Sequence, residues 1–137
     1  MNKKITLVFI AGFFFLIAGG YLISSSPNLS PQTGPSSNVS VMDGTQIIEI
    51  QVRGGYSPRE TYAQAGIPTV LKMETKGTLD CSSYVQIPSL NIQQSLPLSG
   101  IKEFEIPTQE AGTTLNGLCG MGMYNFKIHF ENFSENF

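Results

Sequence analysis

The stretch CGMGMYNFKIHFE, residues 119–131, decides how the C-terminal part of this 137-residue chain folds. Its second half alternates apolar and polar residues, with Phe126, Ile128 and Phe130 separated by polar neighbours. Because successive side chains of a β-strand point to opposite faces, this period of two predicts a strand with one buried face. The two glycines of the first half predict a tight loop that leads into this strand.

The same alternation recurs upstream in several short runs. Turn residues such as Gly54-Gly55 and Lys76-Gly77 separate these runs, and no stretch with a helical period follows residue 23. The alternating runs are Ile48–Val52, Thr69–Glu74, Tyr84–Ile87 and Phe104–Ile106. Short strands at this spacing predict an all-β fold, an antiparallel β-sandwich or barrel of about 90 residues.

The N-terminal third of the chain has a different composition. After a short basic N-terminus, residues 1–4, the segment 5–23 is apolar and uncharged and predicts a transmembrane helix, since about 20 such residues span a bilayer. A cleaved signal peptide is the alternative, but its apolar core is only about 7–15 residues long. Residues 24–45 are rich in Ser and Pro and predict a disordered tether, which leaves 46–137 as the folded domain.

The membrane side of the folded domain stays open at this stage. Lys3 and Lys4 precede the anchor, and the positive-inside rule would then place the domain outside the cell. The folded domain also contains two cysteines, and a domain that needs its cysteines as reduced thiols is expected in the cytosol instead.

Charge and motifs exclude several functions. From Gln46 onward there are six Lys or Arg and nine Asp or Glu residues, without a basic patch, so nucleic acid is not an expected partner. The carboxylates are scattered, and no nucleophile elbow, phosphate loop or Cys-x-x-Cys pair occurs. We therefore expect that the protein is not an enzyme.

Four sulfur-bearing residues form the candidate metal site. Cys119, Met121 and Met123 are spaced two apart, and Cys81, the other cysteine, lies 38 positions upstream. Residues at this spacing project to one side of an extended loop, and thiolates and thioethers are soft donors that favour Cu(I). Two alternatives stay open at this point: a disulfide between the cysteines, and methionines that merely pack in the core.

The remaining composition narrows the choice of metal. A blue-copper site needs two His and one Cys, but this chain has one His, His129, on the polar face of the last strand. Zinc favours thiolate and imidazole over thioether. Four sulfurs therefore predict Cu(I), as one ion or as two ions that share bridging thiolates.

Several short motifs occur along the folded part: Gly55-Tyr56-Ser57-Pro58, Ala65-Gly66-Ile67-Pro68, Asp80-Cys81-Ser82, Ile87-Pro88, Leu96-Pro97 and Cys119-Gly120-Met121-Gly122-Met123-Tyr124. With these motifs the chain resembles the cupredoxin-like domains of Gram-positive copper resistance, in particular small membrane-anchored Cu(I) chaperones, and similar domains at the N-terminus of copper-exporting P-type ATPases. The resemblance implies a cupredoxin-like sandwich that binds Cu(I) through Cys81, Cys119, Met121 and Met123. It also implies that the protein sequesters copper and passes it to a copper-exporting P-type ATPase.

Two other functions stay open from the sequence. One is a redox copper protein for electron transfer. The other is a disulfide-stabilised extracellular β-sandwich that binds no metal.

Overall fold

The structure is a computed structural model that describes residues 34–133 of the chain. The predicted membrane anchor, residues 5–23, lies outside the described residues. Within the described residues, no helix combines the length and apolar character needed to cross a bilayer.

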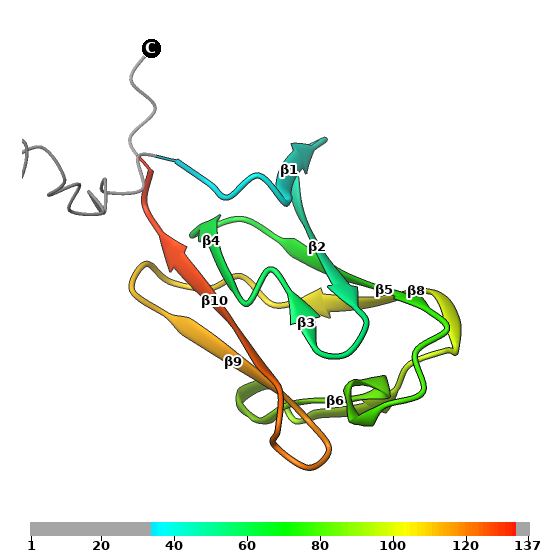
Figure 1. Cartoon of the computed structure of the whole chain (residues 1–137). Coiled ribbons are helices and arrows are strands. Elements are labelled where there is room, and N and C mark those ends of the chain that lie inside the picture. Colours follow the sequence, from blue (N-terminus) through cyan, green and yellow to red (C-terminus); the bar gives the residue numbers. More distant parts are fainter. Residues whose placement is uncertain (1–33, 134–137) are drawn as a thin grey trace, which may run out of the picture. The chain divides into compact units, whose positions relative to one another are not determined.

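The described residues form two five-stranded sheets (Figure 1). The first sheet has the order β1-β2-β5-β8 with β3 paired to β2, and its strands are β1 (Val39–Met42), β2 (Thr45–Val52), β3 (Tyr56–Ser57), β5 (Thr69–Lys76) and β8 (Ser99–Ile106). The second sheet has the order β4-β10-β9-β6-β7, and its strands are β4 (Glu60–Gln64), β6 (Tyr84–Ile87), β7 (Ile92–Ser95), β9 (Thr114–Cys119) and β10 (Asn125–Glu131). Two short 3-10 turns, η2 (Cys81–Ser83) and η3 (Pro88–Leu90), flank β6.

The predicted all-β sandwich is confirmed, but its strand pairing is mixed rather than wholly antiparallel. β2 pairs with β5 in parallel, and β4 pairs with β10 in parallel. The alternation of side chains along a strand has the same period in both kinds of pairing. The sequence pattern therefore predicted the strands without fixing the direction of their neighbours.

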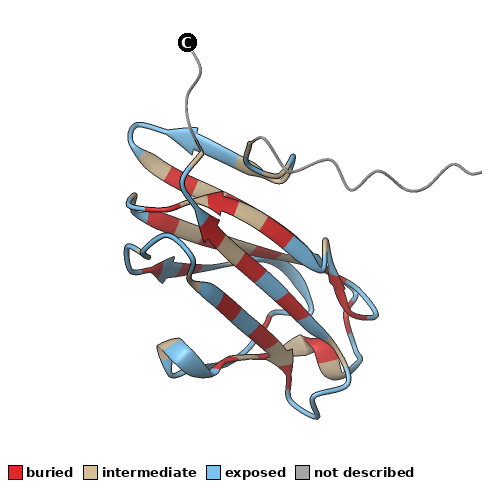
Figure 2. Cartoon of the chain, turned by 90° about the vertical axis from the view of Figure 1, so that its left-hand side faces the viewer, coloured by how far each residue is buried: buried red, intermediate tan, exposed pale blue. Residues whose placement is uncertain are grey.

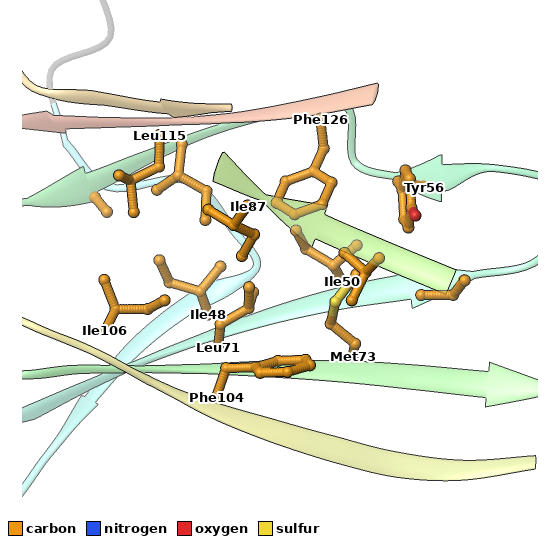
Figure 3. Close-up of a cluster of buried hydrophobic side chains, with 14 of the residues drawn as sticks. Ile48, Ile50, Tyr56, Leu71, Met73, Ile87, Phe104, Ile106, Leu115 and Phe126 are labelled. Atoms are coloured by element: carbon orange, nitrogen blue, oxygen red, sulfur yellow. The ribbon is translucent and has the colours of Figure 1, made fainter. Parts of the chain in front are cut away.

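The core lies between the two sheets. Buried and exposed residues alternate along the strands (Figure 2), as in β5, where every second residue from Thr69 to Thr75 is buried. Figure 3 shows the side chains that meet from both sheets, among them Ile48, Ile50, Leu71, Met73, Ile87, Leu115 and Phe126. Each of these is at most 2% exposed, and burying one aliphatic or aromatic side chain of this kind contributes about 1.5–3 kcal/mol.

The folded part begins earlier than residue 46. Ser36 and Tyr62 are joined by two hydrogen bonds: the Ser36 N–H donates to the Tyr62 carbonyl at 2.8 Å, and the Tyr62 N–H donates to Ser36 Oγ at 2.7 Å. β1 pairs along β2, although the sequence assigned both Ser36 and β1 to the tether. Backbone hydrogen bonds hold this segment to β2 and most of its side chains are exposed, so burial of apolar side chains contributes little to its position.

Candidate metal centre

The structure brings the two cysteines together at one end of the sandwich. Cys81 opens η2 and Cys119 ends β9, and the two Sγ atoms lie 2.8 Å apart. Both are free thiols, since a disulfide bond measures about 2.04 Å. The register explains the approach: Val85 of β6 lies opposite Cys119, so the turn that precedes β6 falls beside the end of β9.

The loop after Cys119 wraps around its sulfur atom. The Tyr124 N–H donates to Cys119 Sγ at 3.4 Å, while the Cys119 N–H donates to the Tyr124 carbonyl at 2.9 Å. The Gly122 N–H closes the loop by donating to the Cys119 carbonyl at 2.9 Å, and Gly122 has a φ of 69°, which a side chain would disfavour. Successive backbone N–H groups that converge in this way stabilise a negative charge.

The two thiols differ in acidity. Burial raises the pKa of Cys119, but the hydrogen bond with Cys81 and the N–H groups of Tyr124, Met121 and Met123 outweigh it and lower this pKa below that of an ordinary thiol. The hydrogen bond with Cys119, together with burial and the nearby negative charges, raises the pKa of Cys81 to about 11. Cys119 is therefore the more readily ionised thiol of the pair, and a metal ion held by both sulfurs would have to displace the proton from Cys81.

The two methionines lie in the same loop with their side chains turned to solvent. Met121 is 73% exposed and Met123 is 67% exposed. The alternative that they pack in the core is therefore wrong for both. Their ligation of a metal stays a prediction, as does that of the two cysteines.

Asp80 fixes the turn that carries Cys81. Its carboxylate accepts hydrogen bonds from the Ser82 N–H at 2.8 Å, from the Ser82 hydroxyl and from the Gly54 N–H at 3.0 Å. The hydrogen bonds from Ser82 are the main cause that lowers the pKa of Asp80. Asp80 had no predicted role, although an Asp two residues before a Ser at a turn is a local signal for this cap.

We expect Asp80→Ala to loosen this turn while leaving the sandwich folded. Losing such a cap costs about 1 kcal/mol, which raises the population of the open turn about fivefold. Hydrogen exchange followed by NMR should show about fivefold faster exchange at the Ser82 amide. Glu110→Ala removes an exposed carboxylate elsewhere and should leave this rate unchanged; an unchanged rate in Asp80→Ala itself would contradict the assignment.

Three tyrosines surround the cysteines. The Tyr56 hydroxyl donates to the Ser82 carbonyl at 3.3 Å, and its ring packs edge-on against Phe126 with 5.0 Å between ring centroids (Figure 3). Burial is the main cause that raises the pKa of Tyr56, with a further contribution from the thiols, so the hydroxyl stays protonated. Tyr84 packs against Gly120 and Tyr124 packs against Gly55, and a Cβ atom at these glycines would lie 3.2 and 3.3 Å from the neighbouring ring, so each ring would have to shift slightly. No local sequence signal reveals these contacts.

His129 takes no part in the cysteine cluster. Its Nδ1 lies 3.0 Å from Thr114 Oγ1, its ring stacks on Tyr62, and its Nε2 is 3.8 Å from a carboxylate oxygen of Glu60. Within residues 34–133, no three His, Cys, Asp or Glu side chains gather closely enough to hold a metal ion.

Comparison with known proteins identifies the fold family. The chain matches the family described as "Cupredoxin-like domain" over residues 13–129. It belongs to the cupredoxin-like domain family. No curated protein matches this cupredoxin-like chain at a significant level.

Two solved structures of copper proteins are similar to this cupredoxin-like chain. One is the metal-binding domain of the Streptococcus pneumoniae D39 Cu(I)-exporting P-type ATPase CopA with Cu(I), at 25% identity and a TM-score of 0.60, covering 67% of this chain and 91% of that one. The other is a copper-binding protein in its apo form, at 26% identity and a TM-score of 0.62, covering 68% of this chain and 94% of that one. The chain thus has the cupredoxin-like fold and resembles copper-binding domains.

Proposed function

We propose that this protein is a membrane-tethered Cu(I) chaperone that sequesters copper and passes it to a copper-exporting P-type ATPase, without catalysing a chemical reaction. The observation that carries the proposal is the pair of thiols 2.8 Å apart at the start of a loop with two exposed methionines. This set of soft donors suits Cu(I), and the similar structures include a Cu(I)-bound domain of such an ATPase.

The surroundings of His129 argue against the electron-transfer alternative. A blue-copper centre needs two imidazoles, and the only histidine of the chain is already engaged by Thr114, Tyr62 and Glu60. The two free thiols likewise favour metal binding over a disulfide-stabilised domain.

We propose that the site holds two Cu(I) ions of unequal affinity. The thiolates of Cys81 and Cys119 bridge both ions, and the thioethers of Met121 and Met123 complete the coordination of the more exposed ion. Because the methionines are exposed and thioethers are neutral donors, this second ion is the one that transfers most readily.

The stoichiometry gives a direct prediction. Titration of the full-length protein with Cu(I) in the presence of a chromophoric chelator should reach two equivalents for the wild type and one for Met121→Ala/Met123→Ala. The tighter ion should keep its affinity within about tenfold, since both cysteines remain. Met42→Ala, which removes an exposed methionine from β1, serves as the matched control and should still bind two ions. Saturation of the wild type at one equivalent would rule out the second ion.

Transfer to an ATPase is tested separately from binding. The Cu(I)-loaded full-length protein is mixed with the metal-binding domain of a copper-exporting P-type ATPase, and the copper in each protein is measured after they are separated. We expect copper to move to the ATPase domain in this mixture. On a shared membrane, tethering of donor and acceptor would also raise their effective concentration into the millimolar range. Copper that stays with the donor at all ratios would restrict the function to sequestration.

We propose that residues 5–23 anchor the protein and that the cupredoxin-like domain faces the cytosol, where thiols stay reduced and export begins. A membrane-impermeant maleimide should then label Cys81 only after lysis. Labelling in intact cells would place the domain on the outer side, as Lys3 and Lys4 suggest.

A further inference from the structure

A cationic groove lies beside the sulfur loop. It has a volume of about 420 Å³, and its walls include Arg53, Gly54 and Gly55 before β3, Arg59 before β4, Met123 in the loop and Asn125 at the start of β10. No Asp or Glu is among its lining residues. Two guanidinium groups therefore share one groove in a domain that carries six basic and nine acidic residues from Gln46 onward.

Neither arginine is neutralised by the part of the chain that the structure describes. The ion pairs in residues 34–133 involve Lys72, Lys76 and His129, not an arginine. Glu60 follows Arg59, but its carboxylate lies 3.8 Å from the His129 ring. Among the described residues, the one side-chain hydrogen bond from either arginine runs from Arg59 Nη2 to Asn125 Oδ1 at 3.1 Å, which orients this guanidinium without cancelling its charge.

Met123 connects the groove to the candidate metal site. It is 67% exposed, lines the groove, and is also one of the four predicted sulfur ligands. A molecule in the groove therefore lies next to a donor atom that can take over its metal ion. A volume of about 420 Å³ falls within the range of about 300–1,000 Å³ that is typical of small-molecule sites, whereas protein partners bury flatter and larger surfaces.

We infer that this groove binds a small carboxylate-bearing thiol, of the class of glutathione, that delivers Cu(I) to the protein. The inference rests on the proposed function, since it names the source of the copper. The carboxylates pair with Arg53 and Arg59, because planar guanidinium groups bind carboxylates through two parallel hydrogen bonds. The thiolate of the carrier then holds its Cu(I) against Met123.

The delivery is a ligand exchange without oxidation or reduction. The thioether of Met123 binds the Cu(I) that the carrier's thiolate holds, and the Cys119 thiolate then replaces the carrier's sulfur. The carrier leaves as a thiolate and takes a proton from solvent. The copper stays Cu(I) throughout, and each bond to the carrier that breaks is replaced by a bond to the protein.

The first test needs no copper. Apo full-length protein in detergent micelles is titrated with S-methylglutathione, which keeps both carboxylates but has a blocked thiol, and the backbone amides are followed by NMR. We expect saturable shifts at Gly54, Gly55 and Asn125, and their loss in Arg53→Gln/Arg59→Gln. Lys72→Gln/Lys102→Gln removes the same charge from β5 and β8 and should leave the shifts unchanged.

The second test measures delivery. Stopped-flow absorbance compares Cu(I) uptake from glutathione with uptake from cysteamine, a thiol without a carboxylate. The arginine variant should take up Cu(I) from glutathione about tenfold more slowly at low ionic strength, with no change for cysteamine, and the difference should shrink in 1 M salt. The equilibrium affinity for Cu(I) should be the same in both proteins.

Several results would overturn the inference. The first is an absence of chemical-shift changes in the groove with S-methylglutathione. The second and third are, in the arginine variant, an equal slowing of Cu(I) uptake from cysteamine or a lower equilibrium affinity for Cu(I). The fourth is stronger binding of a hexaglutamate peptide in the groove, which would indicate an acidic protein partner. If the wild type bound no Cu(I) at all, the proposed function would fail, while the copper-free titration would still decide whether the groove binds carboxylates.

Discussion

Replacing Cys119 by serine is expected to lower the affinity of the protein for Cu(I) by more than about 100-fold. Changes outside the first coordination sphere already cost about 10–100-fold, and this change removes the thiolate itself. Cys119 is the more acidic thiol of the pair, and a serine hydroxyl is a hard, neutral donor that Cu(I) does not favour. Competition of the full-length protein with a chromophoric Cu(I) chelator measures the effect.

Cys81→Ser should weaken binding to a similar extent, because the two sulfurs lie 2.8 Å apart and act together. Cys119 is only 1% exposed, so a buried hydroxyl there adds a folding cost of about 1–3 kcal/mol. Cys119→Ala avoids that hydroxyl and should lose copper binding equally while staying better folded. A wild-type affinity in either cysteine variant would end the proposal of a shared sulfur site.

Replacing Gly117 by alanine is expected to lower the free energy of unfolding by about 3 kcal/mol or more. Gly117 of β9 lies directly opposite Phe126 of β10, and a Cβ atom at this position would come within 2.1 Å of the Phe126 ring. Phe126 is fully buried and its ring packs edge-on against Tyr56, so a shift of the ring would disturb this contact (Figure 3). Urea denaturation of the apo protein measures the loss.

A double-mutant cycle isolates this contact. Phe126→Leu alone should cost about 1 kcal/mol, and the double variant Gly117→Ala/Phe126→Leu should be less destabilised than the sum of the two single variants. Asn116→Ala, an exposed neighbour on β9, should stay within about 0.5 kcal/mol of the wild type. If the loss of stability in the double variant equalled the sum of the losses in the two single variants, the alanine would be colliding with something other than the Phe126 ring.

The fold could be predicted from the sequence wherever one face of a strand is buried. Phe126, Ile128 and Phe130 alternate with polar residues, and the structure buries all three. β1 lies outside this rule, because it is held by backbone pairing to β2 and is largely exposed. The alternation of apolar and polar residues also gave no indication that β2 pairs with β5, and β4 with β10, in parallel.

From the sequence, the candidate site could be predicted only where it is formed by residues that are close together in the chain. The spacing of Cys119, Met121 and Met123 is a property of five consecutive residues, and the loop after Cys119 needs only its own glycines and N–H groups. The hydrogen bonds of Asp80 to Ser82 are equally local.

By itself, then, the sequence determined the all-β character and pointed to four candidate sulfur ligands, because side-chain period and donor softness are properties of single residues and their near neighbours. Only the tertiary structure decided that Cys81 meets Cys119 and that Arg53 and Arg59 share a groove with Met123. The physical reason is that these contacts follow from the order of strands in the sheets: β6 beside β9 brings the cysteines together, and β4 beside β10 brings Arg59 toward the loop. That order is fixed by the packing of the whole core between the two sheets, which no short stretch of sequence encodes.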